Sequence, residues 1–145
     1  MKSNLKIYTA SLEDISLEEL IKNEYLPIFA IKRLDYFPTL KRYSNAPIHL
    51  KSLAPSDMLQ KGLDDGKISG EEFEKRFAIE MCKVPFLDVV KKLERLSEYN
   101  NAKGVVIITP EKSFDHSYRK VLSMILNYSG FLLKGVEEYE KRGNK

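Results

Sequence analysis

The chain is short of cysteine, histidine and tryptophan, and these shortages exclude several kinds of protein. It has one cysteine, two histidines and no tryptophan among 145 residues. A single thiol, Cys82, cannot form an internal disulfide, which favours a reducing, cytoplasmic setting. One cysteine and two histidines do not make the usual ligand set of a zinc site, so no metal and no cofactor is expected. Glycine-rich phosphate loops and the HExxH, GxSxG and CxxC motifs are also missing.

Long apolar runs and an excess of one charge are missing too. No run is long enough to span a membrane, and residues 1–10 lack the apolar region of a signal peptide. The 24 Lys and Arg residues are interleaved with 21 Asp and Glu residues, for a net charge of +3. A dominant electrostatic footprint for nucleic acid is therefore not expected, although binding through a local basic patch stays open. With 43% apolar residues, the chain is expected to form one globular domain over residues 1–145.

Short apolar runs alternate with amphipathic stretches, which is the pattern of an α/β fold. The expected strands are rich in β-branched and aromatic residues and cover residues 5–10, 25–31, 105–109 and 131–136. Helices are expected after Ser16 and between the polar turn 109–119 and about residue 128. This order predicts a mainly parallel sheet of about four strands, flanked by helices in a three-layer, Rossmann-like arrangement.

A helical insertion is expected over residues 54–99, between the second and third strands. Its helices are predicted at 53–63, 69–83 and 85–99, and the second begins with a capping box of Ser69 and Glu72. Cys82 lies beside the apolar stripe of that second helix and is expected to be an inert, at least half-buried thiol. The charged tail, residues 137–145, is predicted to be helical and then frayed.

Residues 34–53 show no periodicity and are expected to form a long irregular connection. Connections of this length in a compact domain are often functional. Its aromatic residues Tyr36, Phe37 and Tyr43 and its basic residues Lys41 and Arg42 could line a surface for a protein or a nucleic acid, or the aromatic residues could only pin the loop.

Polar residues follow the ends of the expected strands, and the polar turn 109–119 carries most of them. Because ligands of parallel sheets bind beyond the carboxyl ends of the strands, we expect a site at this edge. The residues gathered there are Arg33, Glu111, Lys112, Asp115, His116, Ser117 and Arg119. The helix that follows the turn points its N-terminus at the same edge, which favours an anion. The hypothesis is a nucleotide or phosphorylated ligand, neutralised by Arg33, Lys112 and Arg119 and bound by the backbone near Ser117.

Other interpretations of the same residues stay open. Asp115 could simply cap the helix, and the two arginines could pair with Glu111 or Asp115 to fix the loops. His116 could be solvated, or could act as the general base of a hydrolase or transferase.

Three stretches carry a family resemblance. They are Leu-Ala-Pro-Ser at 53–56 followed by Gly-Lys-Ile-Ser-Gly-Glu-Glu-Phe at 66–73, then Ile-Lys-Arg at 31–33, and then residues 108–122. On these residues the chain resembles the domain-of-unknown-function 488 family in its small archaeal and bacterial form. The pattern of that family in the third stretch is a strand ending in Cys, then Tyr-Glu-Lys, and then Cys-His-Arg opening a helix.

The chain keeps some residues of the family pattern and lacks others. Arg33, Glu111, Lys112 and Arg119 match it, whereas Thr109 and Ser117 stand at the two cysteine positions, and Pro110 and Tyr118 replace Tyr and His. The resemblance therefore implies a divergent member without the thiols and the histidine of the family motif. Since no activity is established for the family, the resemblance implies a fold and a site location rather than a reaction.

Overall fold

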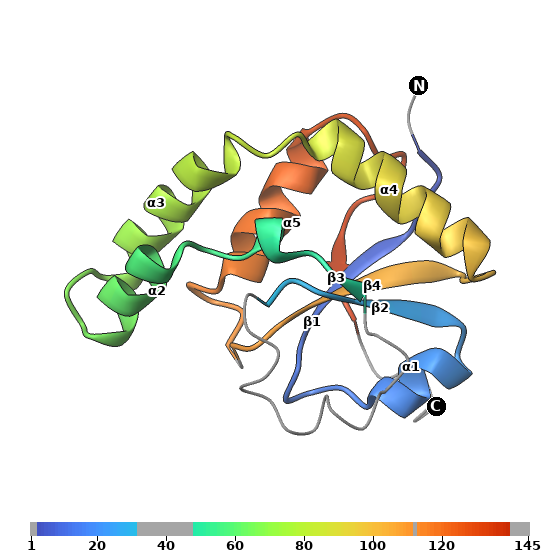
Figure 1. Ribbon diagram of the computed structural model, residues 1–145, viewed down its shortest axis with the longest axis horizontal. Helices are drawn as coiled ribbons and strands as arrows, with labels where there is room; N and C mark the ends of the chain where they lie inside the picture. The colour runs from blue at the N-terminus through green and yellow to red at the C-terminus, as the bar shows by residue number, and fades with distance from the viewer. Residues whose placement is uncertain (1–2, 32–47, 112, 140–145) are drawn as a thin grey trace.

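A five-stranded, all-parallel sheet lies at the centre of the computed structural model, which describes residues 3–31, 48–111 and 113–139 (Figure 1). The strands lie in the order β3-β2-β4-β1-β5. They are β1 (Ile7–Ser11), β2 (Tyr25–Phe29), β3 (Ile48–His49), β4 (Gly104–Thr109) and β5 (Glu137–Glu138). With helices on both faces, this confirms the predicted α/β, Rossmann-like three-layer fold, with one strand more than expected.

Strand β4 is the middle of the sheet. All six of its residues are buried, and it pairs with β1 on one side and with β2 on the other. A continuous β-branched run suits such a strand, because helices cover both of its faces and neither face needs polar residues. The side chains alternate between two cores: Val105 and Ile107 belong to one, and Val106 and Ile108 to the other.

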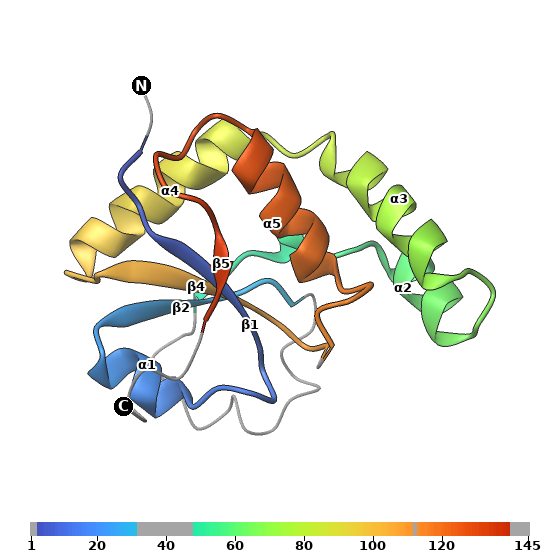
Figure 2. The same cartoon turned by 180° about the vertical axis from the view of Figure 1, so that it is seen from behind.

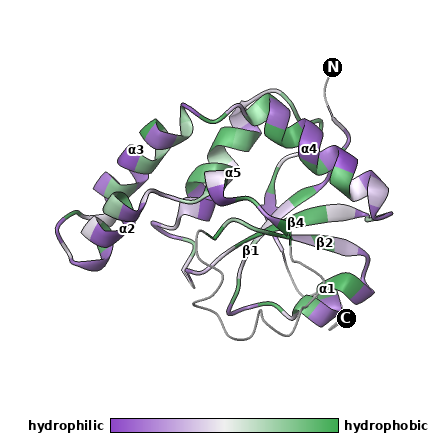
Figure 3. Cartoon of the chain, viewed as in Figure 1, coloured by the Kyte–Doolittle hydropathy of each residue, from purple (hydrophilic) through white to green (hydrophobic). Residues whose placement is uncertain are grey.

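The helices cover the two faces of the sheet unequally. Helix α1 (Leu17–Lys22) packs on one face, and α4 (Phe86–Tyr99) and α5 (Tyr118–Tyr128) pack on the other (Figure 2). Helices α2 (Asp57–Asp64) and α3 (Gly70–Met81) lie beside α5 at the far end of the second face. The central strand β4 is coloured mostly apolar, whereas the helices carry both hydrophobic and hydrophilic colours (Figure 3).

Helices α2 and α3 both begin after a serine cap, and the capping box predicted Ser69 as the cap of α3. The side chain of Ser56 accepts the backbone N–H of Leu59 at α2, and that of Ser69 accepts the N–H of Glu72 at α3. Each serine satisfies one of the backbone donors that a helix leaves unpaired at its start. Within the described ranges, no helix is long and apolar enough to cross a membrane.

The prediction for the last strand was wrong. Residues 131–136 contribute only an isolated bridge, between Leu132 and Ser3, and the strand is β5, within the tail predicted to be helical. The backbone gives the reason. The edge of β1 that faces away from β4 offers backbone groups for pairing, and there the N–H of Tyr139 donates to the carbonyl of Thr9. A sheet edge with unpaired groups can take a polar segment as a partner, because the pairing uses the main chain.

The expectation of an irregular stretch over residues 34–53 was wrong at its end. Residues 48–49 form the edge strand β3, and the 3₁₀ turn η3 (Lys51–Leu53) follows. The imidazole of His49 is hydrogen-bonded to the carbonyl of Ile31, which ties β3 to the end of β2. Residues 34–47, with the aromatic and basic side chains noted in the sequence, lie outside the described residues.

Candidate functional site

The carboxyl ends of β1 and β4 form a topological switch point. From β1 the chain crosses one face of the sheet through α1 to β2, whereas from β4 it crosses the opposite face through α5 to β5. The chain therefore leaves two neighbouring strands toward opposite faces, which opens the place where parallel sheets bind ligands. The predicted edge and the N-terminus of α5 meet at this point (Figures 1 and 2).

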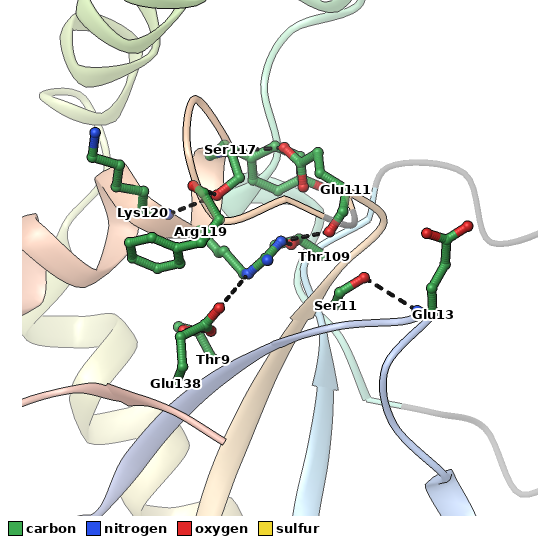
Figure 4. A network of polar contacts seen from close by, with 11 residues as sticks. Thr9, Ser11, Glu13, Thr109, Glu111, Ser117, Arg119, Lys120 and Glu138 are labelled. Carbon is green, nitrogen blue, oxygen red and sulfur yellow. Dashed lines mark hydrogen bonds and ion pairs between the residues drawn. The ribbon is translucent and has the colours of Figure 1, made fainter. Parts of the chain in front are cut away.

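Arg119, in the first turn of α5, is the central charge at this edge and is only 2% exposed (Figure 4). Its Nε donates to Oε1 of Glu138 at 3.0 Å. Its Nη1 donates to Oγ1 of Thr109 at 3.2 Å and to the carbonyl of Glu111 at 2.5 Å. The ring of Phe114 lies 5.7 Å from the guanidinium carbon. The end of β4, the turn that follows it and β5 thus all bind the same buried guanidinium.

Glu138 comes from β5 and was not found by reasoning from the sequence. Its second oxygen, Oε2, accepts the hydroxyl of Thr9 at 2.6 Å, so both oxygens are hydrogen-bonded. Thr9, in the middle of β1, and Thr109, at the end of β4, are fully buried. The available signal was indirect: a buried arginine needs a carboxylate partner, and the acidic pair at 137–138 follows the last apolar segment.

Glu111 places a second carboxylate at the start of α5. Its Oε2 accepts the backbone N–H of Tyr118 at 2.9 Å, one of the first amides of the helix. Its Oε1 is enclosed and makes no hydrogen bond of normal geometry with the part of the chain that the structure describes. Burial raises the pKa of Glu111, and this effect outweighs the N–H of Tyr118 and the charge of Arg119, which both lower it. The start of α5 therefore binds a carboxyl oxygen, which comes from Glu111 of this chain.

Ser117 is the N-cap of α5, a role that the sequence analysis considered for Asp115. Its buried hydroxyl oxygen accepts the N–H of Lys120 at 3.2 Å and donates to the carbonyl of Phe114 at 2.6 Å. At the end of β1 a similar local bond forms, since the side chain of Ser11 accepts the N–H of Glu13 (Figure 4). Both hydroxyls shape the edge by closing turns.

Tyr118 links the same helix start to β2. Its hydroxyl donates to the carbonyl of Ala30 at 2.7 Å, and the side chain is buried. Burial raises the pKa of the Tyr118 phenol well above its usual range, and the charge of Glu111 adds to the effect. The residue at the histidine position of the family motif is therefore a neutral hydrogen-bond donor that ties α5 to the sheet.

His116 faces away from this cluster, toward α3. Its Nδ1 lies 2.6 Å from Oε2 of Glu74, and the other oxygen of Glu74 pairs with Nζ of Lys120 at 3.1 Å. The backbone of His116 is left-handed, with a φ of 60°. The structure thus separates His116 from Arg119, although the two are only three residues apart in the sequence.

The structure does not bring all the predicted site residues together. Arg33 and Lys112 lie outside the described residues, and Asp115 is exposed. Glu111, Ser117 and Arg119 do lie together at the switch point. Among the described residues, no group of three or more His, Cys, Asp or Glu side chains could hold a metal ion. Cys82 is exposed at the end of α3, so the expectation of a buried thiol was wrong.

Comparison with known proteins gives a family and no individual relative. Neither the curated proteins nor the solved structures contained a match to this chain. The family model described as "Domain of unknown function DUF488" matches residues 31–126, about two-thirds of the chain. The match includes Glu111, Ser117 and Arg119, whereas Thr9 and Glu138 lie outside it. Since the match covers most of the sequence, the chain belongs to the DUF488 family.

Proposed function

We propose that this protein binds an anionic small molecule, a nucleotide or a phosphorylated compound, at the switch point between β1 and β4. The observation that carries the proposal is the buried Arg119 in the first turn of α5, held where the two strands end. A fixed positive charge beside a helix N-terminus, at the ligand-binding edge of a parallel sheet, is suited to an anion.

The described contacts of Arg119 define what it would contribute. Its hydrogen bonds to Glu138, Thr109 and Glu111 fix the guanidinium in place, and its burial reduces screening by solvent. In this proposal Arg119 supplies a preorganised charge rather than the main direct contact. The bond from the N–H of Tyr118 to Glu111 supports the helix part of the proposal, because that amide already binds a carboxylate oxygen.

Arg33 and Lys112 are the proposed direct contacts. Lys112 follows Glu111 in the turn, and Arg33 lies shortly after β2, the neighbour of β4 on its other side. The backbone near Ser117 would donate to the same ligand, while the N–H of Ser117 itself donates to the carbonyl of Phe114. Glu111 would act through its contacts, since its carbonyl accepts from Arg119 and its carboxylate from the N–H of Tyr118.

Thermal denaturation and titration calorimetry with ATP, ADP and inorganic phosphate test the proposal. We expect at least one of these anions to stabilise the wild type, because a ligand at 100 times its Kd adds about 2.7 kcal/mol. Lys112→Ala and Arg33→Ala should each weaken binding by about tenfold or more, as expected for a lost charged hydrogen bond. Lys103→Ala is the matched control, because Lys103 pairs with Glu24 before the start of β4. Absence of binding to the wild type, or equal affinity in all variants, contradicts the proposal.

A second candidate function is general-base catalysis by His116, in a hydrolase or transferase. The observation that favours it is the contact of Nδ1 with the carboxylate of Glu74, which orients a histidine and leaves Nε2 for proton transfer. Assays against ester and phosphoester substrates, with His116→Asn as the comparison, test this candidate. An activity unchanged in His116→Asn would exclude the role.

A further inference from the structure

The turn between β4 and α5 joins helix α3 to the Arg119 cluster, which consists of Arg119 and the groups that contact it: Thr109, Glu111, Phe114 and Glu138. On one side of the turn, the carbonyl of Glu111 accepts from Arg119, and the ring of Phe114 lies against the guanidinium. On the other side, His116 reaches α3 through Glu74. A shift of the turn relative to α3 would therefore move the carbonyl of Glu111 and the ring of Phe114, which contact Arg119.

His116 fits closely against the start of α3. The residue there is Gly70, and a Cβ atom at that position would lie 2.4 Å from Cγ of the imidazole. No side chain fits between the ring and the helix at this distance. His116 also has a left-handed backbone, a conformation that a β-carbon disfavours. The glycine in α3 and the left-handed backbone of His116 thus occur on the two sides of one close contact, between the imidazole and α3.

The charges around the imidazole come from both neighbouring helices. Glu74 of α3 is 17% exposed at its side chain and binds His116 with one oxygen and Lys120 of α5 with the other. Burial by itself would raise the pKa of Glu74, but the hydrogen bonds and charges of His116 and Lys120 lower it below its usual value. Asp115 precedes His116 and is exposed. Of the side-chain types in this group, histidine is the one whose charge ordinarily changes between pH 5 and 8.

We infer that His116 is a positioning residue, which fastens the turn between β4 and α5 to α3 and fastens it more tightly when the imidazole is protonated. A protonated ring forms an ion pair with Glu74, whereas a neutral ring keeps only a hydrogen bond and the packing on Gly70. The fastening weakens as the pH rises from 5 to 8. The inference does not depend on the proposed ligand, because it concerns the position of the turn itself.

Amide hydrogen exchange of residues 113–117 tests the inference, measured from pH 5.5 to 8.0 and corrected for intrinsic exchange rates. In the wild type we expect the protection of these amides to fall by about two- to fivefold across this range, the size expected of a partly exposed ion pair. Glu74→Gln and His116→Asn should remove the pH dependence, and asparagine is chosen because it tolerates a left-handed backbone. Gly70→Ala should lower protection at every pH, because it displaces the ring without changing a charge.

Glu72→Gln is the control, since it breaks the exposed pair of Glu72 with Arg76 on the same helix and leaves the turn untouched. Its exchange should follow the wild type. Circular dichroism establishes that each variant is folded, and any one of the three test variants is sufficient if another does not fold. A pH-independent wild type, or a pH dependence that persists in Glu74→Gln and His116→Asn, overturns the inference. So does protection in Gly70→Ala equal to that of the wild type.

Discussion

Two clusters of charges lie around the first turn of α5, and they differ mainly in burial. In the Arg119 cluster the guanidinium is 2% exposed and is held by β4, the following turn and β5. In the His116 cluster the imidazole is 51% exposed and pairs with Glu74 of α3, whose other oxygen pairs with Lys120 of α5. Arg119 and His116 come from the same short stretch of sequence but point to opposite sides of the turn.

The difference indicates what each cluster does for the protein. In the Arg119 cluster the guanidinium itself is buried, so losing its carboxylate partner would leave a charge inside the fold, and the fold depends on the pair. Breaking the exposed cluster returns its groups to solvent at little cost, so it can vary with pH while the fold persists. The sheet edge therefore combines a fixed charge with a turn whose attachment can be adjusted.

The largest effect is expected from Arg119→Ala. Removing the guanidinium leaves the buried hydroxyl of Thr109 and the carbonyl of Glu111 without their donor, and should lower the free energy of unfolding by about 2–5 kcal/mol, since each unsatisfied buried group costs about 1–3 kcal/mol. Urea denaturation at pH 7 measures it. The control is Lys120→Ala, the next residue in α5, which breaks only the pair with Glu74. Similar losses for the two variants would contradict the distinction between buried and exposed clusters.

Glu138→Gln should have the next largest effect. The amide keeps the shape of the carboxylate but removes the charge opposite Arg119, and the loss should be about 1–3 kcal/mol. Glu137→Gln changes the adjacent, exposed residue of β5 and should stay within about 0.5 kcal/mol of the wild type. Chemical denaturation of both variants side by side gives the answer. Equal stability of the two would mean that β5 contributes only its backbone.

How much of this arrangement could be predicted depends on whether the signal is local. The run Val105–Thr109 is apolar and β-branched, and so predicts a covered strand from neighbouring residues alone. The Ser69 cap does the same for the start of α3. The rule that parallel strands end at one edge placed Arg119 and Glu111 together without any knowledge of their contacts.

What could not be predicted are the partners supplied by distant parts of the chain. Glu138 is 129 residues from Thr9, and β5 pairs through its backbone, which leaves no apolar pattern in its side chains. Glu74 is 42 residues from His116, and its role follows from the position of α3 beside α5. The predicted strand at 131–136 shows the opposite error, because its apolar residues Leu132 and Val136 pack into the core, while the segment pairs only at the single bridge of Leu132 with Ser3.

A smaller, pH-dependent effect is expected from Glu111→Gln. Because the folded-state pKa of Glu111 is raised, the folded protein binds this proton more tightly than the unfolded chain does. Its contribution to stability is therefore present at low pH and is lost as the pH rises from the usual value near 4.5 through the raised folded-state pKa. Glutamine resembles the protonated acid, so the stability of the variant relative to the wild type should increase over that range. Free energies of unfolding between pH 4 and 8 measure the slope, and the opposite slope would refute a buried, proton-retaining Glu111.

The smallest effect is expected at the exposed cluster, where a double-mutant cycle isolates one pair. His116→Asn, Glu74→Gln and the double variant should give a coupling energy of at most about 1 kcal/mol at pH 6, and less at pH 8, because only a protonated imidazole carries a charge. The bond between Lys120 and Glu74 is common to the wild type and His116→Asn, so the cycle subtracts it. Urea denaturation at both pH values supplies the four free energies. If the coupling at pH 6 approached the loss caused by Arg119→Ala, exposure would not set the strength of charge pairs around α5, and the two clusters would have to be regarded as equally necessary to the fold.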